Sequence, residues 1–429
     1  MCTLSLSPTV AQPSDQIMKS IRPIILLVVL SIFSCDSEDD APVVEPAFIT
    51  IDLRSTFPGV DRLWAFVTDS KGEVIASQKL SVGKNKFTGT APDVINVTFL
   101  DWSIGTQSHY RFTTHPDVAP NSVIVMDQAN GLGWYSPGEI SLSAKISVTN
   151  FEQSINTAPS LLITDGYAYG FTQTTPPEMT LQLHKSSVNV LVSGFKDDSS
   201  NPVYGMINDV KNGDIKSIDF NDLVPFDKTI SLPRGNSLFA YIGGYKLDGT
   251  KKVSFTMFST LLENSPLPGN INPRVGYLDG FDLYETYVST WLETPLSGVA
   301  IYRKTGTLNP SITLPEYEMT IQDPDLESFK FTYTADSDFQ LHTWTYNENN
   351  NYVFWDIYSD DNSLPVFKKI PEDILSQFPI LDFSKFQHET SRFYHCTDGY
   401  NYNDYFEDYQ KGNYPFTNPE YYELNFSSH

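Results

Sequence analysis

The sequence predicts a mainly β protein built from tandem β-sandwich domains, with one short helix in the C-terminal domain. Short runs rich in Val, Ile, Thr and aromatic residues recur along the chain, and turn residues separate them at close intervals. Such residues suit a pleated, half-buried surface, and many short strands at close spacing are typical of sandwiches. Helical patterns are few, so sheets are expected to carry the fold.

The expected strands start at residues 48–53, where apolar and polar side chains alternate. Runs at 63–67 and 74–76 flank a turn-rich tetrapeptide, residues 69–72, which predicts a hairpin. The remaining expected strands cover residues 94–99, 180–192, 237–245, 253–262, 329–333, 341–346 and 352–358. No convincing internal repeat is evident among them.

The expected helix covers residues 370–378. Pro371 suits a first helical turn, where the missing N–H is not needed, and Glu372 and Asp373 complement the positive end of a helix. The apolar positions of this segment fall on one helical face, and Pro379 ends it. We therefore expect about two turns packed on a larger element.

The chain has room for two or three domains after an export signal. A Gly- and Pro-containing stretch, residues 306–310, is typical of a connector. We divide the chain into an upstream extension with signal peptide (1–34), an acidic tether (35–46), a β-sandwich domain (47–150), a second β-rich domain (151–305) and an aromatic-rich C-terminal β domain (306–429).

The first forty residues have the layout of an export signal. Lys19 and Arg22 precede an apolar run at 24–33, which is too short to span a membrane because a spanning helix needs about 20 apolar residues. The sequence Leu-Ser-Ile-Phe-Ser-Cys, ending at Cys35, resembles a bacterial lipobox, in which the cysteine is acylated. We expect lipid on Cys35 to hold the protein at a membrane; the alternative is an ordinary signal peptide with a chance cysteine.

Two resemblances extend this reading. The relaxed lipobox and the acidic stretch at 36–40 resemble the anchor and surface-export signal of Bacteroidetes lipoproteins, which implies an outer-membrane, cell-surface location. Under an enterobacterial sorting system Asp36 would instead indicate inner-membrane retention. Residues 65–74 with 87–89 resemble the carboxypeptidase-regulatory or transthyretin-like sandwich, which implies an Ig-like or transthyretin-like first domain over about 55 residues.

Charge and cysteine content exclude some partners and some chemistry. The net charge of −24 repels phosphates, so nucleic acid is not an expected partner. Cys2 lies upstream of the expected mature start and Cys35 is expected to carry lipid, which leaves Cys396 alone. No intramolecular disulfide is expected, so packing must hold the body together.

No catalytic or metal-binding motif stands out. His109 and His115 lie on one face of an expected strand with Asp117 nearby, but such scattered histidines are more often plain surface residues. Cys396 would need a distant base such as His388 to act as a nucleophile. Acidic clusters at 323–327 and 356–362 have oxygen ligands that suit Ca²⁺ but do not match an EF-hand loop. We expect no cofactor, with Ca²⁺ as the weaker alternative.

The C-terminal stretch from Phe393 to Tyr422 is the most distinctive, because it contains eight tyrosines. Tyrosine offers a flat apolar face and a hydroxyl group, which suits recognition of sugars or protein surfaces. The candidate ligand-binding residues are Trp344, Tyr346, Trp355, Tyr400, Tyr402 and Tyr405. The alternative is that these rings only cover a domain with few aliphatic residues.

Together these observations favour a membrane-anchored surface lipoprotein that binds a glycan or a partner outer-membrane protein without catalysis. The layout of anchor and body resembles the accessory lipoproteins of Bacteroidetes nutrient-uptake systems. Two alternatives stay open. One is an extracellular polymer-degrading enzyme of the glycoside hydrolase type, and the other is a structural or adhesion component of an envelope assembly.

Overall fold

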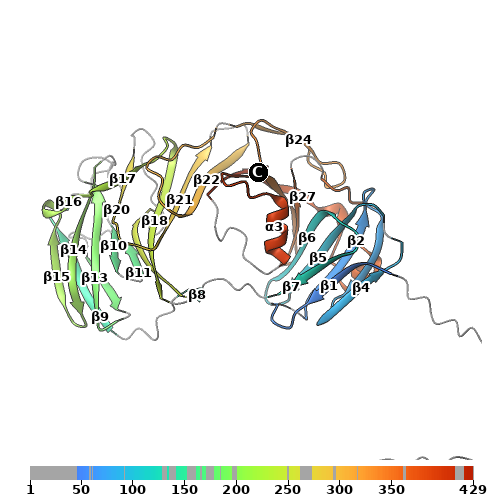
Figure 1. Cartoon of the computed structure of the whole chain (residues 1–429), viewed down its shortest axis with the longest axis horizontal. Helices are drawn as coiled ribbons and strands as arrows, with labels where there is room; N and C mark the ends of the chain where they lie inside the picture. Colours follow the sequence, from blue (N-terminus) through green and yellow to red (C-terminus); the bar gives the residue numbers. More distant parts are fainter. Residues whose placement is uncertain are drawn as a thin grey trace, which may run out of the picture. The chain divides into compact units, whose positions relative to one another are not determined.

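The computed structural model describes residues 46–428 except for short gaps, and the body of the protein is Ala47–His429. The gaps cover residues 58, 60, 91, 128–132, 135–141, 152–160, 165–166, 171–177, 184, 196–200, 249–250, 261–272, 293–295, 316, 361–363 and 411–419. The fold is mainly β, as predicted, with sheets that are consistent with β-sandwich domains (Figure 1). Among the described residues, neither helix has the length and apolar composition that a membrane-spanning helix requires.

Residues 47–126 form a seven-stranded sandwich, here called module 1. Its strands are β1 (Ala47–Leu53), β2 (Leu63–Asp69), β3 (Val74–Lys79), β4 (Gly83–Thr88), β5 (Ile95–Ser103), β6 (Ser108–Val118) and β7 (Ser122–Met126). One sheet has the order β4-β1-β7 and the other begins β3-β2-β5-β6. The first strand pairs antiparallel with the fourth and parallel with the seventh, and all other pairs are antiparallel.

The hairpin between β2 and β3 shows how the sequence sets this fold locally. The Asp69 carboxylate accepts hydrogen bonds from the backbone N–H groups of Lys71 and Glu73, both at 2.9 Å, which closes the turn. Gly72 has a φ of +79°, and a Cβ there would lie 2.5 Å from the carbonyl oxygen of Val366. The turn therefore requires glycine at this position, and the predicted hairpin is confirmed.

Residues 142–219 repeat the same strand order as module 2. The strands are β9 (Leu142–Thr149), β10 (Leu161–Thr164), β11 (Tyr167–Gly170), β12 (Glu178–Leu183), β13 (Ser187–Phe195), β14 (Pro202–Lys211) and β15 (Ile215–Asp219). One sheet is β12-β9-β15 and the other is β11-β10-β13-β14, extended by β16 (Val224–Pro225). β9 again pairs antiparallel with the fourth strand and parallel with the seventh. A 3₁₀ turn, η1 (Phe220–Asp222), follows.

Residues 228–312 repeat the order once more as module 3. The strands are β17 (Lys228–Ser231), β18 (Asn236–Asp248), β19 (Lys251–Ser259), β20 (Arg274–Tyr277), β21 (Leu283–Leu292) and β22 (Ser297–Gly306). β17 pairs antiparallel with β20, and a parallel bridge between Ser231 and Ser311 stands in the seventh-strand position. The second sheet has the order β19-β18-β21-β22, so three successive segments share one topology.

Module 4, residues 319–427, repeats only part of this order. Its elements are β23 (Met319–Asp323), β24 (Lys330–Tyr333), β25 (Phe339–Glu348), β26 (Asn351–Ser359), α2 (Glu372–Gln377), η3 (Phe383–Lys385), β27 (Gln387–Cys396), α3 (Tyr402–Gln410) and β28 (Tyr421–Ser427). The order β26-β25-β27-β28 matches the order of the third, second, fifth and sixth strands in the other modules. Between β26 and β27, where the others have their fourth strand, the described residues form α2 and η3.

One sheet of 13 strands joins modules 1, 4 and 3. β6 pairs parallel with β26, and β28 pairs antiparallel with β22; the far edge is formed by β8 (Gly133–Trp134) beside β19. This sheet contains strands from all three of the expected domains. Pairing within a sheet does not test where independent domains end, so the boundaries near 150 and 305 stay predictions.

The predicted helix at 370–378 is present as α2, and a second helix, α3, lies in the tyrosine-rich segment. The predicted strands are also present, with one difference. The single run expected at 180–192 forms two strands, β12 and β13, which lie in different sheets of module 2. Alternation continues on both sides of residues 184–186, so the pattern alone did not reveal the break.

Candidate functional site

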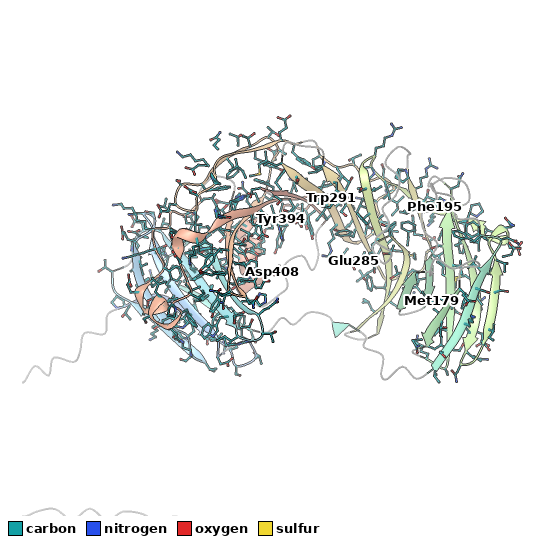
Figure 2. All side chains as sticks on the ribbon, turned by 180° about the vertical axis from the view of Figure 1, so that it is seen from behind. Met179, Phe195, Glu285, Trp291, Tyr394 and Asp408 are labelled. Carbon is teal, nitrogen blue, oxygen red and sulfur yellow. The ribbon has the colours of Figure 1, made fainter. Side chains whose placement is uncertain are left out.

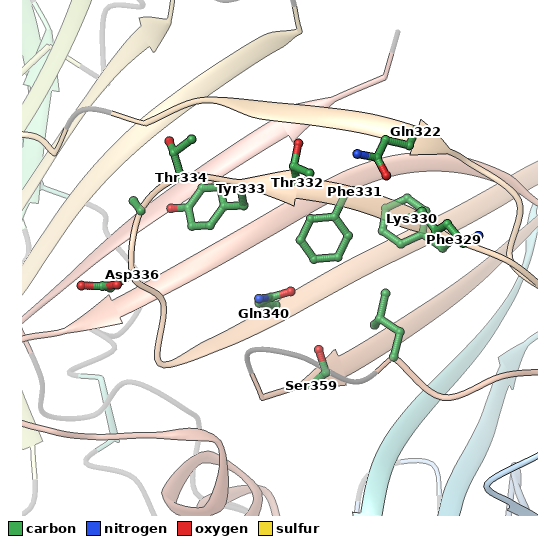
Figure 3. A pocket seen from close by; sticks show the side chains of 12 residues that line it. Gln322, Phe329, Lys330, Phe331, Thr332, Tyr333, Thr334, Asp336, Gln340 and Ser359 are labelled. Atoms are coloured by element: carbon green, nitrogen blue, oxygen red, sulfur yellow. The ribbon is translucent and has the colours of Figure 1, made fainter.

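A cavity of about 870 Å³ lies in module 4 between β24 and the main sheet (Figure 3). Aromatic, amide and hydroxyl side chains dominate its lining. The lining residues are Gln322, Phe329, Lys330, Phe331, Thr332, Tyr333, Thr334, Ala335, Asp336, Gln340, Ser359 and Leu364. Most of them come from β24 and the residues directly beside it, so this strand forms one wall over its whole length.

β24 lies over β25 and β27 with its rings directed at the sheet. Tyr333 stacks on Phe393 with ring centroids 3.8 Å apart, and Phe331 lies 4.9 Å from the His342 ring. β23 lies on the side of β28, since Met319 belongs to the same apolar cluster as Phe426. The cavity extends towards β26, where Ser359 lines it, and Gln322 of β23 also contributes to its lining.

The edge of β24 that faces away from β23 has no partner strand among the described residues. On the other edge, the Thr334 N–H donates to the Glu318 carbonyl at 3.2 Å and Thr332 is paired with Thr320. Backbone groups alternate between the two edges of a strand, so those of Phe331 point away from β23. The N–H and carbonyl groups of Phe331 therefore lie on the edge of β24 that adjoins the cavity.

Two buried polar residues on the main sheet form the floor of the cavity. Gln340 and Ser359 are cross-strand neighbours on β25 and β26, with 2% and 1% of their surface exposed. The Gln340 amide is engaged, because its Oε1 lies 3.0 Å from His342 Nε2 and its Nε2 donates to Ser337 at 3.3 Å. The Ser359 hydroxyl has no hydrogen-bond partner within the described residues. A buried hydroxyl of this kind is costly unless a further group bonds it.

A linear series of hydrogen bonds between side chains lies beneath the cavity. Ser391 Oγ lies 2.7 Å from His342 Nδ1 and 2.9 Å from His388 Nε2, and His388 Nδ1 contacts Ser428 Oγ at 3.0 Å. Burial holds the pKa of His342 well below its usual value. The rings of Phe329 and Phe331 cover the two histidines. The Ser391 hydroxyl is fully buried, so this arrangement stabilises the core and is closed to a substrate.

Three of the candidate residues from the sequence lie in the core shared by modules 1 and 4. Trp344 and Trp355 are fully buried; their indole N–H groups donate to the Pro324 carbonyl and to Thr114 Oγ1, each at 2.9 Å. Tyr346 is half-buried, and its hydroxyl donates to the Ile380 carbonyl at 3.0 Å. Burial raises the pKa of Tyr346 to about 12.

The other three candidates belong to a separate cluster, in which Tyr402 and Tyr405 lie on α3 and Tyr400 directly precedes it. Tyr405 is 2% exposed and stacks on Tyr358 with ring centroids 4.6 Å apart, while Tyr402 is 7% exposed. Tyr400 is half-buried and donates to Asp408 at 3.0 Å. The six residues are thus split between two packed clusters, and their binding role stays a prediction. Their rings have a packing role in this structure.

Two further residues weighed from the sequence are buried here. His115 is fully enclosed by aromatic rings, including Phe406 at 4.6 Å and Tyr409 at 4.4 Å, and burial lowers its pKa to about 3. Burial and nearby carboxylates raise the pKa of Cys396 to about 12. A thiol of this kind is protonated at neutral pH, which does not suit a nucleophile.

No group of three His, Cys, Asp or Glu side chains in the described part of the chain is placed to hold a metal ion. Asp323 instead accepts from Ser328 Oγ at 2.8 Å within its own turn. Asp356 pairs with Arg111 at 3.3 Å and accepts from Thr343 at 2.8 Å. The expectation of no cofactor stays a prediction, as does the weaker alternative of Ca²⁺.

Asp356 belongs to a row of alternating charges on the main sheet. The row runs across neighbouring strands through the pairs Arg111–Asp356, Arg392–Glu423 and Arg303–Glu285. Figure 2 labels Glu285 on β21 and Tyr394 on β27, on two of the strands involved. Burial raises the pKa of Asp356 and of Glu423. The Arg111–Asp356 and Arg303–Glu285 pairs lie at 3.3 and 2.7 Å and the Arg392–Glu423 pair at 3.9 Å, so the row links neighbouring strands and modules.

Sequence reasoning did not identify the cavity. Residues 329–333 were expected as a strand, but nothing in a single strand pattern shows that one edge lacks a partner. The expected lipidation site, Cys35, lies outside the described residues. No family model matches this chain, and no curated protein or solved structure is significantly similar to it.

Proposed function

We propose that the protein is a lipid-anchored cell-surface binding protein that holds a segment of a partner protein in the module 4 cavity. The lipobox-like sequence at Cys35 supports the anchor. The observation that carries the binding role is the cavity itself. It is about 870 Å³ in volume, within the range of ligand sites, and it adjoins a strand edge without a described partner.

The lining favours binding over catalysis. Hydrolysis of a glycosidic bond needs two carboxyl groups about 5–9.5 Å apart. Asp336 is the one carboxylate among the lining residues, and it is exposed at the rim. The Ser391–His342 pair is sealed beneath Phe331. A nucleophile with its base is therefore not presented to the cavity.

The same lining favours a peptide over a sugar. Sugar recognition uses a ring face that is open to the ligand, but Tyr333 and Phe331 direct their rings onto Phe393 and His342 of the sheet. What the cavity presents is a backbone edge, buried Ser359 and the apolar Leu364. These groups suit an extended chain that carries its own amides.

The test is selection from a random octapeptide library and from a glycan array, run in parallel on two proteins. One is the wild-type body, and the other is Ser359→Trp, which fills the cavity. Val224→Trp, on an exposed strand of module 2, is the control for an added indole. Circular dichroism and urea midpoints check that the variants fold.

We expect peptides that bind wild type and Val224→Trp and lose at least tenfold in affinity for Ser359→Trp. Leu364→Trp, which narrows the same cavity from its other wall, should act in the same direction. Selection of glycans alone would overturn the proposal, and so would peptides that bind all four proteins equally.

A further inference from the structure

We infer that the partner segment binds as a β-strand, antiparallel to β24, in the position that the fourth strand occupies in modules 1 to 3. This inference rests on the proposed function, since it specifies how the same cavity is filled. Its basis is the comparison of module 4 with its three relatives in the chain.

In each complete module the first strand is flanked by the fourth. β1 pairs with β4, β9 with β12 and β17 with β20, always antiparallel. β24 lies over the sheet as a first strand does, but its only described partner is β23. In module 4 the described residues between β26 and α2 form no strand beside β24, although Leu364 to Val366 line a smaller cavity together with Lys330 at the start of β24.

The position of the cavity agrees with the position of the absent fourth strand. In module 1, β4 follows β3 after a short turn and so begins beside the third strand. In module 4 the third strand is β26, and the cavity is lined by Ser359 at its end and by Leu364 just beyond it. Figure 3 shows Phe331 above and Gln340 and Ser359 below the space between.

The existing fourth strands indicate the chemistry of the guest. In β4, Asn85 and Phe87 are buried while Lys84 and Lys86 are exposed. In β12 the buried residues are two leucines, again two positions apart. Alternate side chains of a strand face one side, so the guest should place two residues at i and i+2 into the cavity. One should be apolar, to contact Leu364, and the other should accept a hydrogen bond from Ser359.

The probe for this inference is a synthetic octapeptide with the sequence of residues 82–89, which contains β4. Its binding to the wild-type body is measured by fluorescence anisotropy. Two N-methylated forms are compared, one modified at the nitrogens of positions 84 and 86, the other at those of positions 85 and 87. Only one of these sets can face β24, because backbone N–H groups alternate between the edges.

We expect one N-methylated form to lose at least tenfold in affinity and the other to bind within about threefold of the parent peptide. Ser359→Trp and Leu364→Trp should both weaken the parent peptide, and Val224→Trp should not. An equal response to the two methylation patterns would overturn strand pairing. So would the absence of saturable binding up to about 1 mM.

The two proposals fail in different ways. If the library selection yields peptides that need an open cavity but tolerate both methylation patterns, the binding role stands and strand addition is wrong. If the selection yields no peptide that depends on Ser359, the binding role is wrong, and strand addition falls with it.

Discussion

Modules 1 and 4 each contain a four-stranded sheet with the same strand order, but different segments cover the two sheets. In module 1 the sheet β3-β2-β5-β6 packs under the three strands β4-β1-β7 around a closed apolar core. In module 4 the equivalent sheet is covered by the hairpin β23–β24 and, further along, by the segment that contains α2. Equivalent sheets are therefore packed against different segments in the two modules. The cavity lies where the hairpin of module 4 leaves part of its sheet uncovered.

The difference also shows in the strands themselves. β2 is buried at six successive positions, because the module 1 core lies on one side and the α2 segment on the other. In module 4, β24 alternates between half-buried and exposed positions. A strand buried on both faces is fixed by packing, whereas β24 is held by rings on one face and hydrogen bonds along one edge.

The largest expected effect is at the junction of the two modules. Trp355 on β26 is fully buried, and its ring lies 4.7 Å from Phe112 on β6, the neighbouring strand of module 1. Trp355→Ala should lower the free energy of unfolding by about 3–5 kcal/mol, because it removes a large core side chain. Urea denaturation followed by far-UV circular dichroism measures it.

Trp291→Ala is the matched control. This tryptophan is 53% exposed on β21, so its loss should cost less than about 0.5 kcal/mol. Equal losses for the two variants would mean that modules 1 and 4 do not share a core.

A smaller effect separates the complete cover from the incomplete one. Phe87 on β4 is 2% exposed, while Phe331 on β24 is half-buried beside the cavity. Phe87→Ala should cost about 3–4 kcal/mol and Phe331→Ala about 1–2 kcal/mol, since less contact is lost where the cover is open. The same urea titration compares them. A cost at Phe331 as large as that at Phe87 would indicate that module 4 is packed as tightly as module 1.

Local patterns predicted local structure well. The strand expected at 48–53, the turn at Asp69 and the helix of the 370–378 segment each depend on neighbours in sequence, and each is present. The alternation at 48–53 does not appear in the burial of β1, because all of these residues except Thr50 are buried. The threefold topology could not be predicted in this way. The fourth strands have the sequences GKNKFT, EMTLQL and RVGY. Each contains two buried residues, but their sequences are not similar.

The candidate site was harder to predict for a related reason. Trp344 and Trp355 were chosen because tryptophan suits a binding platform, but the same side chain suits a core. They are directly paired across β25 and β26, on the face that α2 and its neighbouring segment cover. Which face of a strand is covered depends on segments far away in the sequence. Ser359 carried no signal at all, because a lone serine after a strand is typical of any turn.

His115 offers a test of how α3 covers the sheet where modules 1 and 4 meet. Its folded pKa of about 3 lies below the unfolded value of about 6.5, so the unfolded chain binds more protons between these values. Proton binding to the unfolded chain at His115 therefore costs no stability above pH 6.5, and the free energy of unfolding decreases as the pH falls below that value. The slope should be about 1.4 kcal/mol per pH unit near pH 5.

His115→Phe should remove that part of the slope while keeping the ring contacts with Phe406 and Tyr409. Urea midpoints between pH 7 and pH 4.5 measure the change. An unaltered slope in His115→Phe would mean that this ring is accessible to protons in the folded protein.

The smallest expected effect compares an ion pair between modules with one within a module. Arg111 on β6 pairs with Asp356 on β26, whose side chain is 8% exposed, whereas Lys145 and Glu178 of module 2 are both more than 40% exposed. Arg111→Met should cost about 1 kcal/mol, because it leaves a buried carboxylate without its cation but the arginine is 58% exposed, so water already screens the pair in part. Lys145→Met should cost less than about 0.5 kcal/mol, since water screens that pair. If the two variants unfold at the same urea concentration, the charge row contributes nothing to joining the modules, and their shared aromatic core must hold the sheet together alone.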